Sequence, residues 1–340
     1  MALITKKKLL YPINEALRAY LQEHERNSDA IDYEELTRYN SSIPLYDSMG
    51  VDTLWETVLF APSDMESIHL QLKLVYANLK SAGNVEVIKH LFIDRIDLCP
   101  FGNTKPYRVR IVNRINDNFD YFYIKRADAS RIYGLELEHL LSPNAINYIV
   151  HNNTLVEEHI AGVPGDQFMK RHINDPFVNK VRLSKEFVKF NERCFVRLLG
   201  DMHSSNFVVD VTPDFEDTHY RIRAIDFDQQ SYESRKAVYF PKYFKQNNPF
   251  IKMGMEVMTP ESMLQYQLEE RSLILNRSIS SKHTLKQLLD AMCTQELSIE
   301  KNIIQLGKEL AEHHNDNRFR KAVNMGELLK LNLSKLLNES

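Results

Sequence analysis

Two short motifs, joined by a pattern of two strands, constrain the fold of this chain more than any other feature. The first motif is Gly-Asp-Met-His-Ser-Ser-Asn at 200–206, and the second is Ala-Ile-Asp-Phe-Asp at 224–228. Segments 207–211 and 220–225 are rich in β-branched and aromatic residues, which predicts a hairpin between the motifs. Segment 195–199, before the first motif, also predicts a strand. We therefore expect two polar loops held by short strands, an arrangement in which functional side chains are often found.

The residue types and spacing in these loops suit phosphoryl transfer. Such a site needs a carboxylate that accepts a hydroxyl proton, and Asp201 has the expected position for this role. It also needs a carboxamide and a second carboxylate that hold metal near the nucleotide phosphates, and Asn206 and Asp226 fit these roles. An Asp or Asn in a surface turn usually bonds only its own backbone. Both motifs, in this order and with a hairpin-sized gap, favour the functional interpretation.

These motifs resemble those of the aminoglycoside phosphotransferase and choline kinase family, a branch of the protein-kinase-like fold. That family carries Gly-Asp-x-His-x-x-Asn and Ile-Asp-Phe-acidic, and both forms stand in this chain at 200–206 and 225–228. Segment 225–235 is particularly similar to choline and ethanolamine kinases. The resemblance implies that the loop histidine, here His203, has a structural role rather than carrying a proton.

The resemblance also implies a fold and a set of ligands. The fold would be α+β and bilobal, with a small antiparallel-sheet N-lobe and a mostly helical C-lobe. The phosphoryl donor would be ATP, with GTP as the alternative, and the cofactor would be Mg²⁺. The acceptor would be a small molecule that bears a hydroxyl group.

Further site residues are expected upstream from the same resemblance. A strand at 120–125 ends in Lys125, which would contact the nucleotide phosphates. In the helix at 131–141, Glu136 lies four residues before Leu140, so it is expected to face the lobe interior and orient Lys125. Glu138 is the alternative partner, and either glutamate could instead belong to a solvated helix face.

Segment 154–165 is similar to the last N-lobe strand of the family followed by its hinge. The resemblance implies that Glu157 and His159 supply a backbone acceptor and a backbone donor to the adenine ring, so that their side chains matter little. An ordinary strand followed by a Gly-Pro loop fits the segment equally well.

The loop expected to cover the phosphates spans 99–106, between strands predicted near 88–98 and 107–112. It holds a single glycine, so phosphate contact would depend on Asn103, Thr104 or Lys105. A second departure from the family is Leu199, which stands where many relatives have a histidine that supports the catalytic loop.

Composition and length define the class of protein and its organisation. The chain has 340 residues and a net charge of −3, which gives no reason to expect nucleic acid or an anionic membrane as a partner. We expect three parts: a helical N-terminal extension at 1–84, an N-lobe at 85–160 and a C-lobe at 161–340. Within the extension, segment 27–50 is polar and is expected to be irregular.

The cysteines and the apolar segments bear on the compartment. Cys99, Cys194 and Cys293 are odd in number and far apart, which argues against a disulfide framework or a zinc site. No apolar run approaches membrane-spanning length and no signal-peptide core is evident. These patterns predict a soluble cytoplasmic protein.

The acceptor is the least constrained part of the prediction. Segment 232–245 is aromatic and basic and is expected near the acceptor side, either forming a pocket or simply packing the lobe. Two other functions stay open. The helical extension and this segment would suit a protein-directed kinase, whereas the glycine-poor loop and Leu199 would suit a nucleotide-binding pseudokinase.

Overall fold

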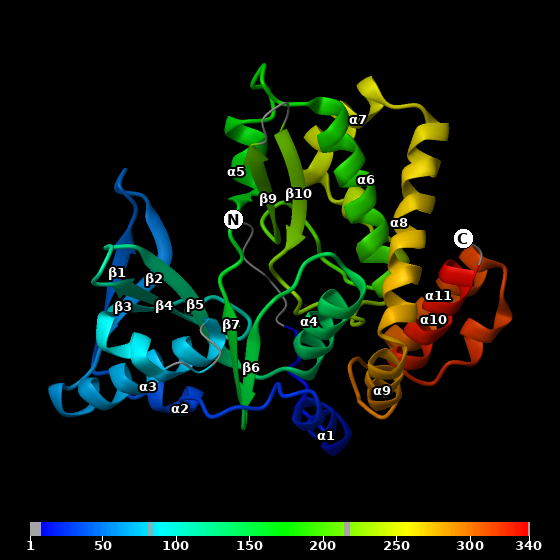
Figure 1. Ribbon diagram of the computed structural model, residues 1–340. Coiled ribbons are helices and arrows are strands. Elements are labelled where there is room, and N and C mark those ends of the chain that lie inside the picture. Colours follow the sequence, from blue (N-terminus) through cyan, green and yellow to red (C-terminus); the bar gives the residue numbers. More distant parts are fainter. Residues whose placement is uncertain (1–7, 81–82, 84, 214–217, 339–340) are drawn as a thin grey trace. The chain divides into compact units, whose positions relative to one another are not determined.

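The computed structural model describes residues 8–80, 83, 85–213 and 218–338 (Figure 1). The chain divides into two compact units. A sheet-rich unit comprises Met1–Asp128 and Ile146–His159, and a mostly helical unit comprises Ala129–Ala145 and Ile160–Ser340. The α+β class, with one sheet-rich and one mostly helical part, is as the sequence predicts.

The sheet-rich unit is built on a seven-stranded antiparallel sheet of order β1-β2-β3-β4-β5-β7-β6. Alternation of apolar and polar residues along these strands gives the sheet one apolar and one polar face. The strands are β1 Ser41–Tyr46, β2 Asp52–Leu59, β3 Leu91–Leu98, β4 Tyr107–Asn113, β5 Phe119–Arg126, β6 Tyr148–His151 and β7 Thr154–Glu158.

Helix α3 (Pro62–Lys80) packs on the apolar face of this sheet. Its Leu72 and Val75 belong to the same buried cluster as Val109 of β4 and Phe122 of β5. The other helical segments of the unit are α1 (Glu15–Glu23), the one-turn α2 (Tyr33–Leu36) and the 3-10 helix η1 (Val85–His90). Burial of these aliphatic side chains is the main stabilising term available to the unit.

The N-terminal part of this unit differs from the expected helical extension at 1–84. Residues 41–46 and 52–59 form β1 and β2, and β2 pairs with β3, so the sheet begins well before residue 85. The prediction that segment 27–50 is irregular is therefore wrong for β1. Its alternation of small, apolar and proline residues hides a strand that depends on pairing with β2 for its hydrogen bonds.

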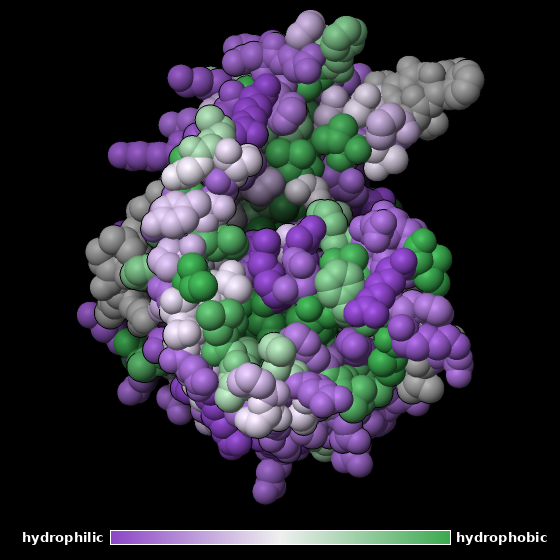
Figure 2. All heavy atoms as spheres, turned by 90° about the vertical axis from the view of Figure 1, so that its left-hand side faces the viewer, coloured by the Kyte–Doolittle hydropathy of each residue, from purple (hydrophilic) through white to green (hydrophobic). Residues whose placement is uncertain are grey.

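Apolar side chains are exposed on the β1–β2 hairpin, including Ile43, Met49 and Val51. Figure 2 looks at the molecule from the side on which Figure 1 shows β1, β2 and α3, and there apolar and polar side chains are interspersed. Scattered exposed apolar residues of this kind are normal for a protein surface.

The helical unit surrounds the long helix α6 and holds a small antiparallel sheet of order β10-β9-β8. Helix α8 (Pro260–Ser280) begins with Thr259 as its N-cap and Pro260 in its first turn. The helices of the helical unit are α4 Ala129–Leu141, α5 Gly165–Arg171, α6 Lys180–Arg197, α7 Asn248–Val257, α8 Pro260–Ser280, α9 Lys282–Met292, α10 Glu300–His314 and α11 Met325–Asn338. Its strands are β8 Val163–Pro164, β9 Phe207–Pro213 and β10 Thr218–Ala224, and its 3-10 helices are η2 Lys236–Tyr239, η3 Pro241–Tyr243, η4 Lys245–Asn247 and η5 Asn317–Lys321.

The predicted strand at 195–199 is wrong, because residues 195–197 complete α6. The run of apolar residues there is buried on all sides, and a short, fully buried apolar run does not distinguish helix from strand. Leu198 ends the helix in the left-handed conformation, with φ of 52°.

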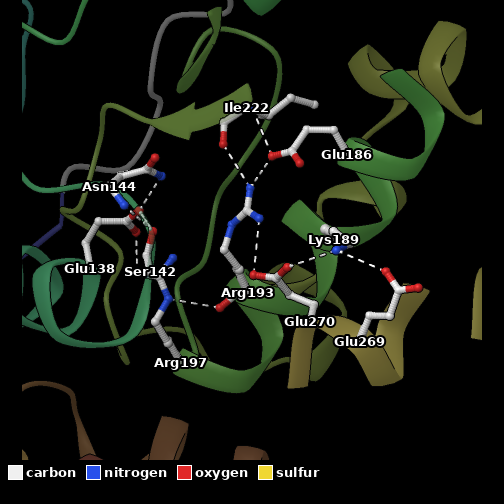
Figure 3. A network of polar contacts seen from close by, with 10 residues as sticks. All are labelled: Glu138, Ser142, Asn144, Glu186, Lys189, Arg193, Arg197, Ile222, Glu269 and Glu270. Atoms are coloured by element: carbon white, nitrogen blue, oxygen red, sulfur yellow. Dashed lines mark hydrogen bonds and ion pairs between the residues drawn. The ribbon is translucent and has the colours of Figure 1, made fainter. Parts of the chain in front are cut away.

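Buried ion pairs connect the helices of this unit (Figure 3). Arg193 of α6 donates to Glu186 of the same helix (2.6 Å), to Glu270 of α8 (3.3 Å) and to the carbonyl oxygen of Ile222 in β10 (3.0 Å). One turn later, Arg197 forms an ion pair with Glu138 of α4. These charges stay paired in the interior, which tolerates them only when every partner is present.

No helix in the part of the chain that the structure describes is long and apolar enough to cross a membrane. The three cysteines are free thiols, and Cys194 is buried in α6.

Candidate active site

The loop that carries Asp201 leaves α6 through a tight reversal. Leu199 pairs with Gln230, and the backbone N–H of Gly200 donates to the carbonyl oxygen of Gln229 (3.2 Å). A Cβ at Gly200 would lie 3.2 Å from that oxygen, so glycine is needed for this close approach. The left-handed conformation falls on Asp201 instead, with φ of 61°. A non-glycine residue held there is a frequent mark of a functional position.

The carboxylate of Asp201 is open to a ligand. Among the described residues it accepts no hydrogen bond, His203 Nε2 lies 3.9 Å from its Oδ2, and its side chain is 36% exposed. Burial, together with the negative charges of Asp226, Glu233 and Asp228, raises the pKa of Asp201 to about 7. A carboxyl group with this pKa can accept a proton near neutral pH.

Asn206 ties the two polar loops together. Its Nδ2 donates to the carbonyl oxygen of Asp201 (2.8 Å), and its own carbonyl oxygen accepts the N–H of Ile225 (3.0 Å). The residue next to Ile225 is Asp226, so one asparagine fixes the spacing between the proposed base and the proposed metal ligand. Its side-chain oxygen, Oδ1, is left on the opposite side of the amide group.

Arg131 of α4 contacts the second loop, which the sequence did not reveal. Its Nη1 donates to Asp226 and to Asp228, each at 2.8 Å, and its Nη2 donates to the carbonyl oxygen of Ile225 (3.3 Å). The backbone N–H of Asp228 also donates to Asp226 Oδ1 (3.0 Å). The sequence offered no signal beyond a basic residue in the first turn of a helix.

Helix α4 is locked against the same loop. Ser130 Oγ donates to the carbonyl oxygen of Gln230 (2.6 Å). Phe227 is buried against Gly134, where an added Cβ would lie 2.9 Å from the Cβ of Phe227. The small residue therefore allows the helix and the loop to approach closely, and this contact places Arg131 over the carboxylates.

His203 is held by its own loop. Its Nδ1 accepts the backbone N–H of Ser205 (3.3 Å), and its ring meets Phe244 edge to face. Burial lowers the pKa of His203, although the carboxylates of Asp226 and Asp166 oppose this effect. A neutral ring that accepts a backbone hydrogen bond is compatible with the structural role expected for it.

The oxygen atoms at this site fit a hard divalent cation such as Mg²⁺. Asp226 Oδ1 accepts two hydrogen bonds, whereas Oδ2 accepts none from the described residues, and Asn206 Oδ1 is likewise left for a ligand. No group of three or more His, Cys, Asp or Glu side chains that could hold a metal occurs within the described ranges. Two protein oxygens with the rest from phosphates and water is a usual Mg²⁺ arrangement.

The raised pKa of Asp201 predicts a pH-dependent effect on stability. A carboxyl group whose pKa rises from 3.8 to about 7 on folding destabilises the protein as pH increases between these values, and the effect is complete above pH 7. Asp201→Asn is expected to raise the free energy of unfolding at pH 8 by about 1–2 kcal/mol, discounted for solvent screening of a partly exposed group. At pH 4 the variant and the wild type should be equally stable.

Urea unfolding of the metal-free protein at the two pH values measures this difference. Asp210→Asn on β9, outside the two loops, serves as the control. If Asp201→Asn raised the free energy of unfolding equally at both pH values, the negative charge of Asp201 would not be the cause of the increase.

In the sheet-rich unit, Lys125 lies at the end of β5, as predicted, and its Nζ bonds Glu157 Oε2 of β7 at 2.7 Å. The Glu157 side chain, which was expected to matter little, thus pairs with this lysine. The alternative partner Glu138 is bonded to Arg197 in the helical unit. Glu136 is buried in α4 of that same unit, and its pairing with Lys125 stays a prediction.

The expected hinge register does not fit the backbone. Glu157 lies in the central strand of a triplet, paired with Tyr123 of β5 and Tyr148 of β6. The N–H of His159 donates to the carbonyl oxygen of Tyr121 (3.3 Å). The predicted donor to adenine is thus already used within the sheet, because strand pairing continues one residue beyond β7.

The loop at 99–106 joins β3 and β4, as predicted, but its three polar residues differ in accessibility. Thr104 is buried, and the carbonyl oxygen of Lys105 accepts the hydroxyl group of Tyr33 (2.8 Å). Asn103 Nδ2 is buried and has no hydrogen-bond partner in the part of the chain that the structure describes. An unpaired buried donor is costly, and an acceptor atom of a ligand would satisfy it.

The polar face of the sheet carries a charged and aromatic row that the sequence did not reveal. Asp97 of β3 is fully buried and accepts from Arg108 of β4 (2.8 Å) and from Arg95 (3.0 Å). The guanidinium of Arg108 lies 4.4 Å from the ring centroid of Trp55 and 5.2 Å from that of Tyr121. Stacking on aromatic rings fixes this cation at the sheet surface.

Of the aromatic residues in the segment 232–245, two pack the lobe. Tyr239 is buried and donates its hydroxyl group to the carbonyl oxygen of Glu233 (2.7 Å), and Phe240 stacks on Phe195 of α6. Tyr243 is exposed. The packing interpretation therefore holds for the buried pair.

No protein-family model matches this chain, and no curated protein matches it. Among solved structures, it is similar to the autoinhibited serine kinase domain of the giant muscle protein titin, with 13% identity, a TM-score of 0.28 and coverage of 59% of this chain and 82% of that one. It is also similar to titin kinase with its flanking domains, with 12% identity, a TM-score of 0.28 and coverage of 73% of this chain and 55% of that one. At these TM-scores the likeness supports no further argument about the chain.

Proposed function

We propose that this protein transfers the γ-phosphoryl group of ATP or GTP to a hydroxyl group of a small molecule. The observation that carries the proposal is the unbonded carboxylate of Asp201, with a pKa raised to about 7, on a loop that Asn206 ties to Asp226. A base, a carboxamide oxygen and a second carboxylate are the groups that this reaction requires.

In the proposed reaction, the acceptor hydroxyl gives its proton to Asp201 as its oxygen forms a bond to the γ-phosphorus. The bond between that phosphorus and the bridging oxygen of the nucleotide breaks, and the nucleoside diphosphate leaves. Asp226 and Asn206 would hold Mg²⁺, which supplies positive charge that stabilises the phosphate oxygens. Burial is the main cause of the raised pKa of Asp201, and a carboxylate with a raised pKa is a better proton acceptor.

Within the sheet-rich unit, Lys125 and Asn103 are the residues that we propose to contact nucleotide phosphates. Lys125 is buried, its Nζ lies 2.7 Å from Glu157 Oε2, and a lysine side chain is a usual ligand of phosphate. The buried Asn103 Nδ2 has no partner among the described residues, which favours Asn103 over Thr104 as a phosphate contact in the loop.

Nucleotide binding is tested by the thermal stability of the purified wild type and of Asp226→Asn. Mg²⁺ with ATP or GTP at about 100 times its dissociation constant should raise the melting temperature of the wild type by at least ~3 °C. The shift should disappear with EDTA and in Asp226→Asn, whereas Asp210→Asn should retain it. No shift with either nucleotide would contradict the proposal.

A binding-only pseudokinase is the second candidate, because Arg131 bonds the proposed metal carboxylate in this structure. A protein-directed kinase differs only in the acceptor. Incubation with γ-labelled nucleotide and a fractionated cell extract separates the three: label in small metabolites supports the proposal, label in protein supports the protein-directed kinase, and a metal-dependent shift without transfer or hydrolysis supports the pseudokinase.

A further inference from the structure

One guanidinium group bridges the two carboxylates that follow β10. Arg131 Nη1 lies 2.8 Å from Asp226 Oδ1 and 2.8 Å from Asp228 Oδ1. The side chain of Arg131 is 3% exposed and that of Asp228 is 13% exposed, whereas that of Asp226 is 38% exposed. The most exposed member of the trio is therefore the residue proposed to hold metal, and the two others are more buried.

Charge explains why such an arrangement persists. Two carboxylates two residues apart repel each other, and a buried arginine is costly unless it is paired. One nitrogen that contacts both carboxylates relieves both costs. The side chain is fixed at its base, because α4 is locked by the bond from Ser130 to Gln230 and by the packing of Gly134 on Phe227.

We propose that Arg131 is a positioning residue that acts as a built-in counter-cation: it holds Asp226 for a single metal ion and keeps Asp228 from serving as a metal ligand. The proposal rests on the proposed function for the role of that metal. Its physical basis is separate, because the two carboxylates share the positive charge of one guanidinium group. Removal of this charge would make the pair more attractive to a divalent cation.

Removal of the guanidinium tests this inference without any need for phosphoryl transfer. Mn²⁺ binding to the nucleotide-free protein is measured by electron paramagnetic resonance for wild type, Arg131→Met, Arg131→Lys and the exposed control Arg221→Met. Arg131→Met is expected to bind Mn²⁺ at least ~10-fold more tightly than wild type. Arg131→Lys retains the charge but not the planar guanidinium group with its several N–H donors, so its Mn²⁺ affinity should lie between those of wild type and Arg131→Met. The Mn²⁺ affinity of Arg221→Met should equal that of wild type.

Melting temperatures with and without Mn²⁺ separate this role from a merely structural one. Arg131→Met should melt below the wild type, and Mn²⁺ should restore most of the loss because the cation replaces the missing charge. Adding Asp228→Asn to Arg131→Met should remove the gain in Mn²⁺ affinity, since that carboxylate is the released ligand.

A lower melting temperature that Mn²⁺ does not restore, with unchanged or weaker Mn²⁺ binding, would overturn the inference. If Arg131→Met does not fold, the neutral variant Arg131→Gln takes its place, and Mn²⁺ binding to Arg131→Gln that equals wild type would overturn the inference as well. If the proposed function is wrong, the wild type will not bind nucleotide. The Mn²⁺ titrations use nucleotide-free protein, so their outcome does not depend on nucleotide binding.

Discussion

Asp201→Asn is expected to reduce phosphoryl transfer by about 10²–10⁴-fold, the usual contribution of a general base. The amide has nearly the shape of the carboxylate but cannot accept the acceptor's proton. Release of labelled phosphate from γ-labelled ATP, in slow hydrolysis with water as acceptor or with an identified acceptor, gives the rate. In the wild type the rate should rise with pH as the carboxyl group of Asp201 loses its proton.

The same variant should keep the Mg²⁺-nucleotide shift in melting temperature, because Asp201 is not a proposed metal ligand. Asp210→Asn, on the adjoining strand, is the matched control and should transfer at the wild-type rate. Undiminished transfer by Asp201→Asn would remove this residue from the proposed mechanism.

Arg197→Met is expected to lower the free energy of unfolding of the helical unit by about 3–5 kcal/mol. The side chains of Arg197 and Glu138 are 1% and 2% exposed, so loss of the arginine leaves a buried carboxylate without its cation (Figure 3). Burial raises the pKa of Glu138, but the charge of Arg197 and hydrogen bonds from Ser142 and Asn144 outweigh burial and lower it. Guanidinium unfolding followed by far-ultraviolet circular dichroism gives the free energy.

Two further variants identify the cause of that loss. Lys330 and Asp290 form a surface ion pair in which both side chains are about half exposed. Lys330→Met breaks this pair and should lower the free energy of unfolding by less than about 1 kcal/mol. The double variant Arg197→Met with Glu138→Leu should recover much of the stability, since apolar replacement of both members removes the uncompensated charge. Equal destabilisation by the single and double variants would point to lost packing of the arginine stem instead.

Local patterns were sufficient for much of the site. The β9–β10 hairpin, the strand ending in Lys125 and helix α4 all lie where the sequence predicts them. Each depends on contacts between residues near in sequence, such as alternating side chains in strands or helix caps. The strand predicted at 195–199 was wrong because its local pattern is ambiguous. An apolar run that is buried on every side shows no periodicity that distinguishes a helix from a strand.

The sequence by itself determined which chemical groups this protein can offer: a carboxylate, a carboxamide and a second carboxylate at fixed spacing on two loops. Only the tertiary structure decided what surrounds them. Arg131 reaches Asp226 across 95 positions, and Lys125 reaches Glu157 across 32. Such pairs form because helices and strands bring distant residues together, and the free energy of each depends on burial and on the other charges nearby, which no local pattern encodes.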